Sequence, residues 1–423
     1  MNKSFLMLVF AFFFISSVSA LTDITNCTEL QGMSVAGDYR LMNNIDCSDT
    51  INWNGGEGFD PIQSFGGIFD GNGYNISNLY INRPTKNLVG LFKNSAGEPL
   101  IKNLGIKNGT MSGKSVGGLV GDMEGGNISN SFFEGMIYCY DGNCGGLVGY
   151  ALYIIINNSY SNVTIIGVGN PVYVGGLVGS LGEGNIYNSY SLSEIKGSLG
   201  YDVGGLVGYN WGYIYNSYAI GTIEGTDYIG GFVGANDDGL IVNSYSISNV
   251  TGNSNIAGFV GENFGTSNIT NSFSNSNVIG TSNIGGFAGL NYESATCTNS
   301  YWNTDNGILT SACATGKTTQ QLATENTFEN WDFTNIWHYQ SNCLPALLGQ
   351  PFLYCLSPEE IIVPSTDKGI IYAIMNSAGA GIGLFFLYLA GSLPFLIIGI
   401  LIAVMVAVIG SSFIGIFKGA KAR

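Results

Sequence analysis

Residues 173–197 read YVGGLVGSLGEGNIYNSYSLSEIKG, and residues 202–225 repeat the pattern as DVGGLVGYNWGYIYNSYAIGTIEG. Both stretches carry a first mark, GGLVG, and a second mark, NSY. Close variants of the first mark recur every 26 to 30 residues, starting at Gly117, Gly145, Gly175, Gly204, Gly230, Ala257 and Gly285. The second mark begins 12 to 14 residues later each time, at Asn130, Asn158, Asn188, Asn216, Asn243, Asn271 and Asn299. Such a fixed period predicts a stack of similar structural units.

The segments within one unit have the composition of short β-strands. GGLVG is apolar, IYNSYS alternates, and Gly, Asn, Asp and Ser separate such runs, whereas no helical periodicity extends over three turns. The period is too short for a propeller blade, which needs about 40 residues. We therefore predict an all-β fold, a β-solenoid with coils of 26–30 residues and with either handedness. About nine coils at roughly 4.8 Å each would form a rod about 43 Å long.

Three residue types are expected to recur at the same place in every coil. The Leu/Val or Phe/Val pair of each first mark would stack into a continuous apolar ladder. The glycines would allow tight turns with positive φ and close approach between neighbouring coils. The asparagine of each second mark would stack as well, with its side-chain amide hydrogen-bonded along the stack.

Charge and cysteine content indicate an exported protein. The formal net charge is −15, and Lys196 is the one basic residue between Ser115 and Gly316, so no nucleic-acid partner is expected. Eight cysteines in four successive local pairs predict disulfides rather than a metal site: Cys27–Cys47, Cys139–Cys144, Cys297–Cys313 and Cys343–Cys355. Eight Asn-x-Ser/Thr sequences permit glycosylation, at Asn26, Asn75, Asn108, Asn127, Asn157, Asn162, Asn249 and Asn268.

The two ends of the chain carry targeting signals. Residues 1–20 have the pattern of a secretory signal peptide, with a retained anchor as the alternative. Residues 393–417 are long and apolar enough for a transmembrane helix, and the basic residues of 418–423 predict a cytoplasmic tail. Between a linker at 357–368 and this helix, residues 369–392 form either a juxtamembrane helix or a second span. We expect a single-pass membrane protein of the cell surface with an extracellular N-terminal ectodomain.

The repeats resemble the GLUG motif, which is named for a Gly-Leu-any-Gly pattern. This motif occurs in bacterial and archaeal surface proteins and near the C-termini of some immunoglobulin-A-cleaving metallopeptidases. Residues 41–84 and 298–337 resemble the N-terminal and closing modules of such proteins. The resemblance implies a capping module at residues 21–86, solenoid repeats at 87–297 and a second capping module at 298–356. It implies no particular activity, because the family shares none.

The sequence carries no recognisable catalytic motif. His338 is the one histidine, so the chain has no HExxH metallopeptidase motif. Asp237 and Asp238 are the one adjacent acidic pair in the repeats, and the Gly-His-Gly and Arg/Lys motifs of pectin-cleaving β-helices are missing. We expect neither an enzyme nor a cofactor, with a polysaccharide-active enzyme as the remaining alternative. Three turns offer oxygen ligands for calcium or are plain turns, at Asp70, Tyr140 and Asn236.

Aromatic residues are the best candidates for ligand binding. Residues 209–218, YNWGYIYNSY, place four of them in one coil: Trp211, Tyr213, Tyr215 and Tyr218. Strand alternation would put Tyr213 and Tyr215 on one face, and Ile214 and Asn216 on the other. Exposed aromatic rings beside Asn and Asp side chains suit the binding of sugar rings. Alternatively, these rings only cover a glycine-rich rod.

The sequence as a whole predicts a non-catalytic surface display or adhesion protein. Its rigid acidic β-solenoid would bind a glycan or another cell-surface protein, with Trp211, Tyr213 and Tyr215 as the ligand-binding residues. The alternative is a passive structural component of an envelope, surface layer or virion.

Overall fold

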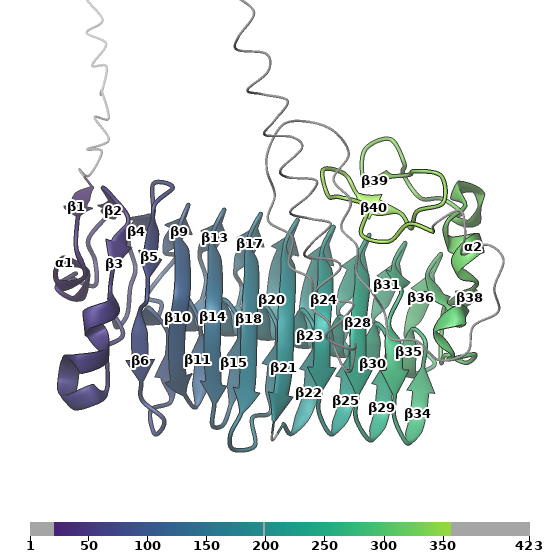
Figure 1. The fold of residues 1–423 in the computed structure, drawn as a ribbon, viewed down its shortest axis with the longest axis horizontal. Coiled ribbons are helices and arrows are strands. Elements are labelled where there is room, and N and C mark those ends of the chain that lie inside the picture. Colours follow the sequence, from purple (N-terminus) through teal and green to yellow (C-terminus); the bar gives the residue numbers. More distant parts are fainter. Residues whose placement is uncertain (1–20, 198, 357–423) are drawn as a thin grey trace, which may run out of the picture. The chain divides into compact units, whose positions relative to one another are not determined.

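The computed structural model describes residues 21–197 and 199–356 (Figure 1). The predicted signal peptide, linker, hydrophobic segments and basic tail lie outside these residues. In the described part of the chain, no helix combines the length and the apolar composition that a membrane span needs. The described residues form a β-solenoid of about nine turns, which confirms the fold that the repeats predict.

Each coil contributes strands to three parallel sheets, here called sheets 1, 2 and 3. In one coil, β19 (Tyr173–Gly175) lies in sheet 3, β20 (Val178–Tyr187) in sheet 1 and β21 (Tyr190–Gly197) in sheet 2. The next coil repeats this order with β22 (Tyr201–Gly204), β23 (Val207–Tyr215) and β24 (Tyr218–Glu224). Each strand pairs in parallel with its counterpart in the next coil, as Val178 does with Val207.

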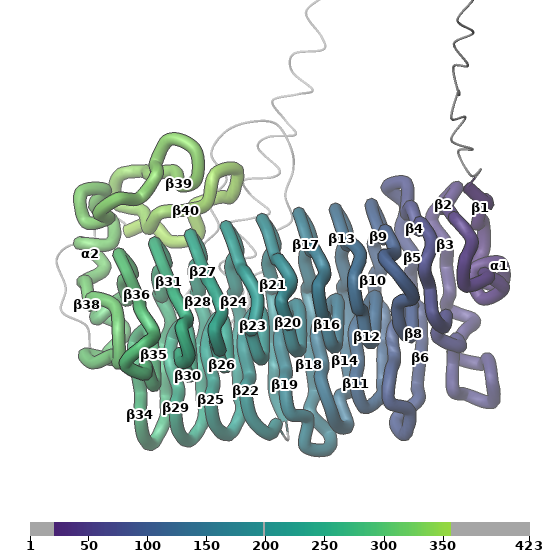
Figure 2. The backbone as a smooth tube through the Cα atoms, turned by 180° about the vertical axis from the view of Figure 1, so that it is seen from behind, coloured from purple at the N-terminus to yellow at the C-terminus, as the bar shows by residue number. Residues whose placement is uncertain are grey.

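The other strands extend the three sheets in both directions (Figures 1 and 2). Sheet 1 also contains β1 (Thr22–Ile24), β2 (Tyr39–Leu41), β4 (Ile68–Asp70), β8 (Phe92–Asn94), β9 (Leu100–Lys102), β12 (Val120–Glu124), β13 (Asn127–Ser129), β16 (Val148–Leu152), β17 (Ile155–Asn157), β26 (Val233–Asp237), β27 (Leu240–Val242), β30 (Val260–Phe264), β31 (Asn268–Thr270), β35 (Ala288–Asn291) and β36 (Thr296–Thr298). Sheet 2 contains β3 (Ile45–Asp46), β5 (Asn75–Ser77), β6 (Tyr80–Asn82), β10 (Gly105–Gly113), β14 (Phe132–Cys139), β18 (Tyr160–Gly167), β28 (Tyr245–Thr251), β32 (Phe273–Ser274), β33 (Asn277–Ile279), β37 (Tyr301–Asn303) and β38 (Thr315–Lys317). Sheet 3 contains β7 (Leu88–Val89), β11 (Ser115–Gly117), β15 (Asn143–Gly145), β25 (Asp227–Gly230), β29 (Ser254–Ala257) and β34 (Ser282–Gly285). Because the parallel pairing reaches β1, residues 21–86 are themselves built into the solenoid.

The apolar residues of the first marks form the predicted ladder in the core. The central Leu or Phe is fully buried in all seven marks: Leu119, Leu147, Leu177, Leu206, Phe232, Phe259 and Phe287. The glycines allow the predicted close approach, because a methyl group on Gly145 would lie 2.1 Å from the carbonyl oxygen of Val148. The prediction that these glycines also form tight turns was wrong for the first marks, since none of their glycines has a positive φ.

Asparagine instead takes the left-handed conformation, at the corner between sheets 1 and 2. The first residue of every second mark has φ between 48° and 53°. The side-chain amides form the predicted ladder, in which Asn216 donates to Asn188 at 3.3 Å and Asn243 donates to Asn216 at 3.2 Å. The prediction that Asn216 lies on the same face as Ile214 was wrong. Asn216 is half-exposed and does not share the inner face with the buried Ile214, because its positive φ turns the chain.

The four disulfides join the pairs that the cysteine spacing predicts: Cys27–Cys47, Cys139–Cys144, Cys297–Cys313 and Cys343–Cys355. The first ties α1 (Cys27–Gln31), at the N-terminal end of the solenoid, to the residue before the 3₁₀ helix η1 (Ser48–Gly56) (Figure 1). Disulfides in such numbers are typical of an oxidising, extracellular compartment.

The C-terminal capping module both ends the solenoid and covers part of its side. The short helices η2 (Thr304–Asn306), α2 (Thr319–Leu322) and η3 (Glu325–Thr327) follow the last coils. Residues 328–356, here called the closing segment, then pack on the outer face of sheet 2 with a small hairpin, β39 (Trp337–His338) and β40 (Ala346–Leu347) (Figures 1 and 2). One apolar cluster joins both parts, including Trp331, Trp337, Leu344 and Leu347 on one side and Tyr218, Tyr245, Phe273 and Tyr301 on the other.

Candidate binding surface

Trp211, Tyr213 and Tyr215 lie together on the outer face of β23. Ile214 is fully buried between the two tyrosines, which confirms the predicted alternation for these three residues. The side chains of Trp211 and Tyr213 are 46% and 45% exposed, and Tyr215 is half-buried. The structure thus brings the predicted ligand-binding residues into one patch, here called the aromatic surface.

The neighbouring strands leave the rings of Trp211 and Tyr213 open. Trp211 is in register with Gly182, which has no side chain, and Tyr213 lies between Asn185 and Leu240. Within the described residues, neither ring stacks on another aromatic ring. An open ring face can pack against the C–H face of a ligand, whereas a stacked ring presents mainly its edge.

Tyr215 and Tyr218 instead belong to stacked rows in different sheets. Tyr215 stacks on Tyr187, with ring centroids 5.2 Å apart. Tyr218 lies beyond the corner in sheet 2, between Tyr190 at 4.7 Å and Tyr245 at 4.9 Å. Burial raises the pKa of the Tyr218 hydroxyl. The aromatic group that the sequence suggests is therefore divided, and Tyr218 is not part of the aromatic surface.

The residues considered for catalysis have separate partners. Asp237 accepts a hydrogen bond from the hydroxyl of a neighbouring tyrosine, and Asp238 accepts two from the backbone and hydroxyl of Thr266. The hydrogen bonds from Thr266 lower the pKa of Asp238. His338 stacks on Phe352 with ring centroids 4.2 Å apart, so it packs within the closing segment.

All three turns considered for calcium use carboxylates within the protein, including Asp237 and Asp238 in the turn at Asn236. Asp70 forms an ion pair with Lys102 at 3.1 Å and accepts a hydrogen bond from Asn103. Asp141, in the turn that begins at Tyr140, lies 4.0 Å from a lysine. In the part of the chain that the structure describes, no three His, Cys, Asp or Glu side chains group together where they could hold a metal ion. These contacts favour plain turns at all three positions.

One carboxyl group that the sequence does not single out is strongly perturbed. Asp202 in β22 shares a register position with Tyr228, Asn255 and Asn283, and all four have a positive φ. Burial, reinforced by the charge of Glu262, raises the pKa of Asp202 to about 7. No sequence signal marks this residue, because its surroundings come from neighbouring coils.

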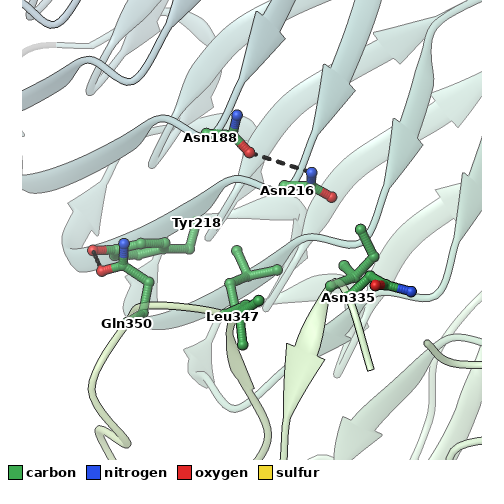
Figure 3. Close-up of a pocket in the computed structure, with 8 residues that line it drawn as sticks. Asn188, Asn216, Tyr218, Asn335, Leu347 and Gln350 are labelled. Carbon is green, nitrogen blue, oxygen red and sulfur yellow. Dashed lines mark hydrogen bonds between the residues drawn. The ribbon is translucent and has the colours of Figure 1, made fainter. Parts of the chain in front are cut away.

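A cavity of about 190 Å³ lies where the closing segment meets the corner between sheets 1 and 2 (Figure 3). Asn188, Asn216 and Tyr218 form its solenoid side, and the closing segment lines the rest. The Tyr218 hydroxyl donates a hydrogen bond to Gln350 Oε1 at 3.1 Å. The sequence could not reveal this cavity, because its two sides lie far apart in the chain.

Residues 200–224 match the family model of the GLUG motif. Halomucin from Haloquadratum walsbyi is 38% identical to the chain over 117 residues, which cover 26% of this chain and 1% of halomucin. The chain therefore spans a very small part of this relative. Among solved structures, a proposed immunoglobulin A1 protease from Bacteroides ovatus aligns with a TM-score of 0.43 and 19% identity, over 78% of this chain and 93% of that one. A structure named IgA1 protease aligns with a TM-score of 0.42 and 16% identity, over 75% of this chain and 26% of that one.

The GLUG match coincides with the coil that bears the aromatic surface. It spans β22, β23 and β24, and so includes Trp211, Tyr213 and Tyr215. Along the whole solenoid, no asparagine of the eight predicted glycosylation sequences is buried: Asn26, Asn75, Asn108, Asn127, Asn157, Asn162, Asn249 and Asn268. None of the eight side chains is therefore enclosed in the core.

Proposed function

We propose that this protein is a non-catalytic display protein of the cell surface that binds glycans through its aromatic surface. The observation that supports this proposal is the exposure of Trp211 and Tyr213, at 46% and 45%. Many other aromatic residues of the solenoid are buried or stacked on a ring one coil away. Two large open rings at adjacent outward positions of one strand are therefore suited to a ligand.

The surroundings favour a neutral polyhydroxylated ligand. Asn185 lies beside Tyr213, and its side-chain oxygen accepts a hydrogen bond from Tyr187 at 3.1 Å, which leaves the amide nitrogen as a donor. Lys196 is the one basic residue between Ser115 and Gly316, so the coils attract no polyanion. Glycans combine apolar C–H faces with hydroxyl groups, which fits rings flanked by amides.

The proposed protein is non-catalytic and anchored in the membrane. The solenoid would act without catalysis, because Asp237 and Asp238 each have a protein partner and face separate neighbours. Residues 393–417 would anchor the chain as a single transmembrane helix. Incubation of the protein with a panel of polysaccharides is expected to release no reducing ends, and sustained release would contradict a non-catalytic role.

Binding is tested with the full-length protein in fluorescent liposomes, whose multivalency amplifies weak contacts. The liposomes are applied to a glycan array and to intact cells. Trp211→Ala and Tyr213→Ala should each weaken binding about tenfold or more, since a central aromatic contact contributes at least about 1–2 kcal/mol.

The matched control is Tyr201→Ala. Tyr201 is 50% exposed, but it lies in sheet 3, so its removal should leave binding unchanged. Equal losses in all three variants would point to nonspecific adhesion of aromatic residues. Silence on both array and cells, from protein with an intact β-sheet spectrum, would favour a passive structural component instead.

A further inference from the structure

We propose that the cavity between the closing segment and the corner of sheets 1 and 2 is a second binding site, for a single neutral sugar ring. Its side chains come from both parts of the fold, with Asn188, Asn216 and Tyr218 facing Asn335, Leu347 and Gln350 (Figure 3). The proposal shares only the ligand class with the aromatic surface, which lies on the outer face of sheet 1 next to this corner.

The size of the cavity selects a small ligand. Its volume of about 190 Å³ is below the roughly 300–1,000 Å³ of pockets for drug-sized molecules. One pyranose ring fits such a space, whereas an oligosaccharide would have to leave it. The site therefore suits a terminal sugar of a longer glycan or a free monosaccharide.

The lining is polar but uncharged, which selects the chemistry of the ligand. Four side chains are primary amides and none carries a charge: Asn188, Asn216, Asn335 and Gln350. An ion would find no opposite charge here to replace its hydration. Amides both donate and accept hydrogen bonds, as the hydroxyl groups of a sugar do, so the lining matches a neutral polyol.

The amides have hydrogen-bonding capacity to spare. Gln350 accepts from Tyr218 through Oε1, and no partner for its Nε2 occurs within the described residues. The ladder bond from Asn216 to Asn188 uses one of the two hydrogens on the Asn216 nitrogen. Asn335 donates to Asp332 at 2.9 Å through its nitrogen, which leaves its side-chain oxygen as an acceptor.

The apolar part of the lining supplies the complementary surface. Leu347 and Leu348 come from the end of the hairpin, and Leu348 is 57% exposed. The C–H face of a sugar ring can pack against these side chains, while its hydroxyl groups bond to the amides. This combination of few directed polar groups and an aliphatic wall is common to small-molecule sites.

The test uses full-length protein in a detergent without a sugar headgroup and measures saturation-transfer NMR. The probes are the methyl glycosides of glucose, galactose, mannose and N-acetylglucosamine, with glucuronic acid as a charged comparison. At least one neutral probe should bind with a Kd of roughly 1 mM, the range expected for so small a ligand. Absence of signal from all four, or tighter binding of glucuronic acid, would overturn the proposal.

Variants locate the binding. Gln350→Ala should weaken it about tenfold by removing amide hydrogen bonds, and Leu348→Trp should abolish it by filling the cavity. Leu309→Trp is the control, because Leu309 is 77% exposed elsewhere on the surface. Wild-type affinity in both cavity variants would refute the site. Trp211→Ala should leave the monosaccharide signal intact, so failure of this site and failure of the aromatic surface are distinguishable.

Discussion

At the scale of the residue, asparagine and glycine divide two tasks that both demand small side chains. Asn216 and its counterparts accept a positive φ because a short polar side chain tolerates the left-handed region, and their amides then bond from coil to coil. Gly145 and its counterparts have an ordinary backbone, but a Cβ there would strike the carbonyl oxygen of Val148. Glycine would also accept the positive φ at the asparagine positions, but it has no side chain to form the amide ladder.

Asp202 should make stability depend on pH. Its pKa of about 7 in the folded protein exceeds the usual aspartate value of 3.8, because burial and the charge of Glu262 disfavour the charged form. Because the folded protein holds the Asp202 proton more tightly than the unfolded chain, its contribution to the free energy of unfolding is highest below about pH 4. This contribution is lost as the pH rises through 7. Asp202→Asn should therefore match the wild-type Tm near pH 4 and exceed it increasingly up to pH 7.

Thermal unfolding of both proteins between pH 4 and 8 measures this difference. Asparagine suits the backbone, because Asn255 and Asn283 occupy the same register position with positive φ. A constant Tm difference across the whole range would show that Asp202 does not titrate as its surroundings imply.

At the scale of the element, the closing segment is a unit distinct from the coils. It packs on a row of stacked rings in sheet 2 that includes Tyr218, and the same row continues through Tyr190 to Tyr160, which lies outside that apolar cluster. Each of these rings is also supported by a neighbour one coil away. The closing segment has no such repetition, so its attachment depends on a few large side chains such as Trp337.

Trp337→Ala should detach the closing segment while the coils remain folded. Trp337 is fully buried against Trp331, Tyr245 and Phe273, and truncation of such a residue costs about 3–5 kcal/mol. Hydrogen exchange should accelerate in residues 328–356 and stay unchanged in residues 87–215. Phe259→Ala, in the core ladder, should instead accelerate exchange in the coils around β29 and β30. Uniform acceleration after Trp337→Ala would contradict the separation of the two units.

The sequence reveals the contacts that recur one repeat apart, but it does not reveal the contacts between segments that lie far apart in the chain. The spacing of GGLVG and NSY predicts the coils, the ladders and the outward position of Tyr213, because each depends on a residue and its equivalent one period away. The separation of Tyr218 from Tyr215 needs the corner at Asn216, which strand alternation ignores. The cavity beside Gln350 needs the closing segment to fold back, and no periodic signal describes that contact.

At the scale of the whole solenoid, a coil should be removable as a unit. Val233 pairs with Val260, so deletion of residues 233–259 would place the following coil in register against Val207. We expect such a protein to keep its β-sheet spectrum and a cooperative melting transition, because the strands of each coil pair only with those of the two coils beside it. A deletion of half that length should abolish folding, since it would bring polar corners into the core. Loss of structure in both deletions would contradict modular stacking.

The in-register pairing also decides how the solenoid responds to pulling. The hydrogen bonds between coils run along the axis, so a load applied between the two ends acts on them in series. A coil of 28 residues, such as the one from Val260 to Ala288, adds about 4.8 Å to the folded length and about 95 Å of extended chain once it unravels. Each coil that yields thus releases roughly twenty times its own height while the others stay folded. Such a tether absorbs mechanical work in steps and lengthens before it breaks.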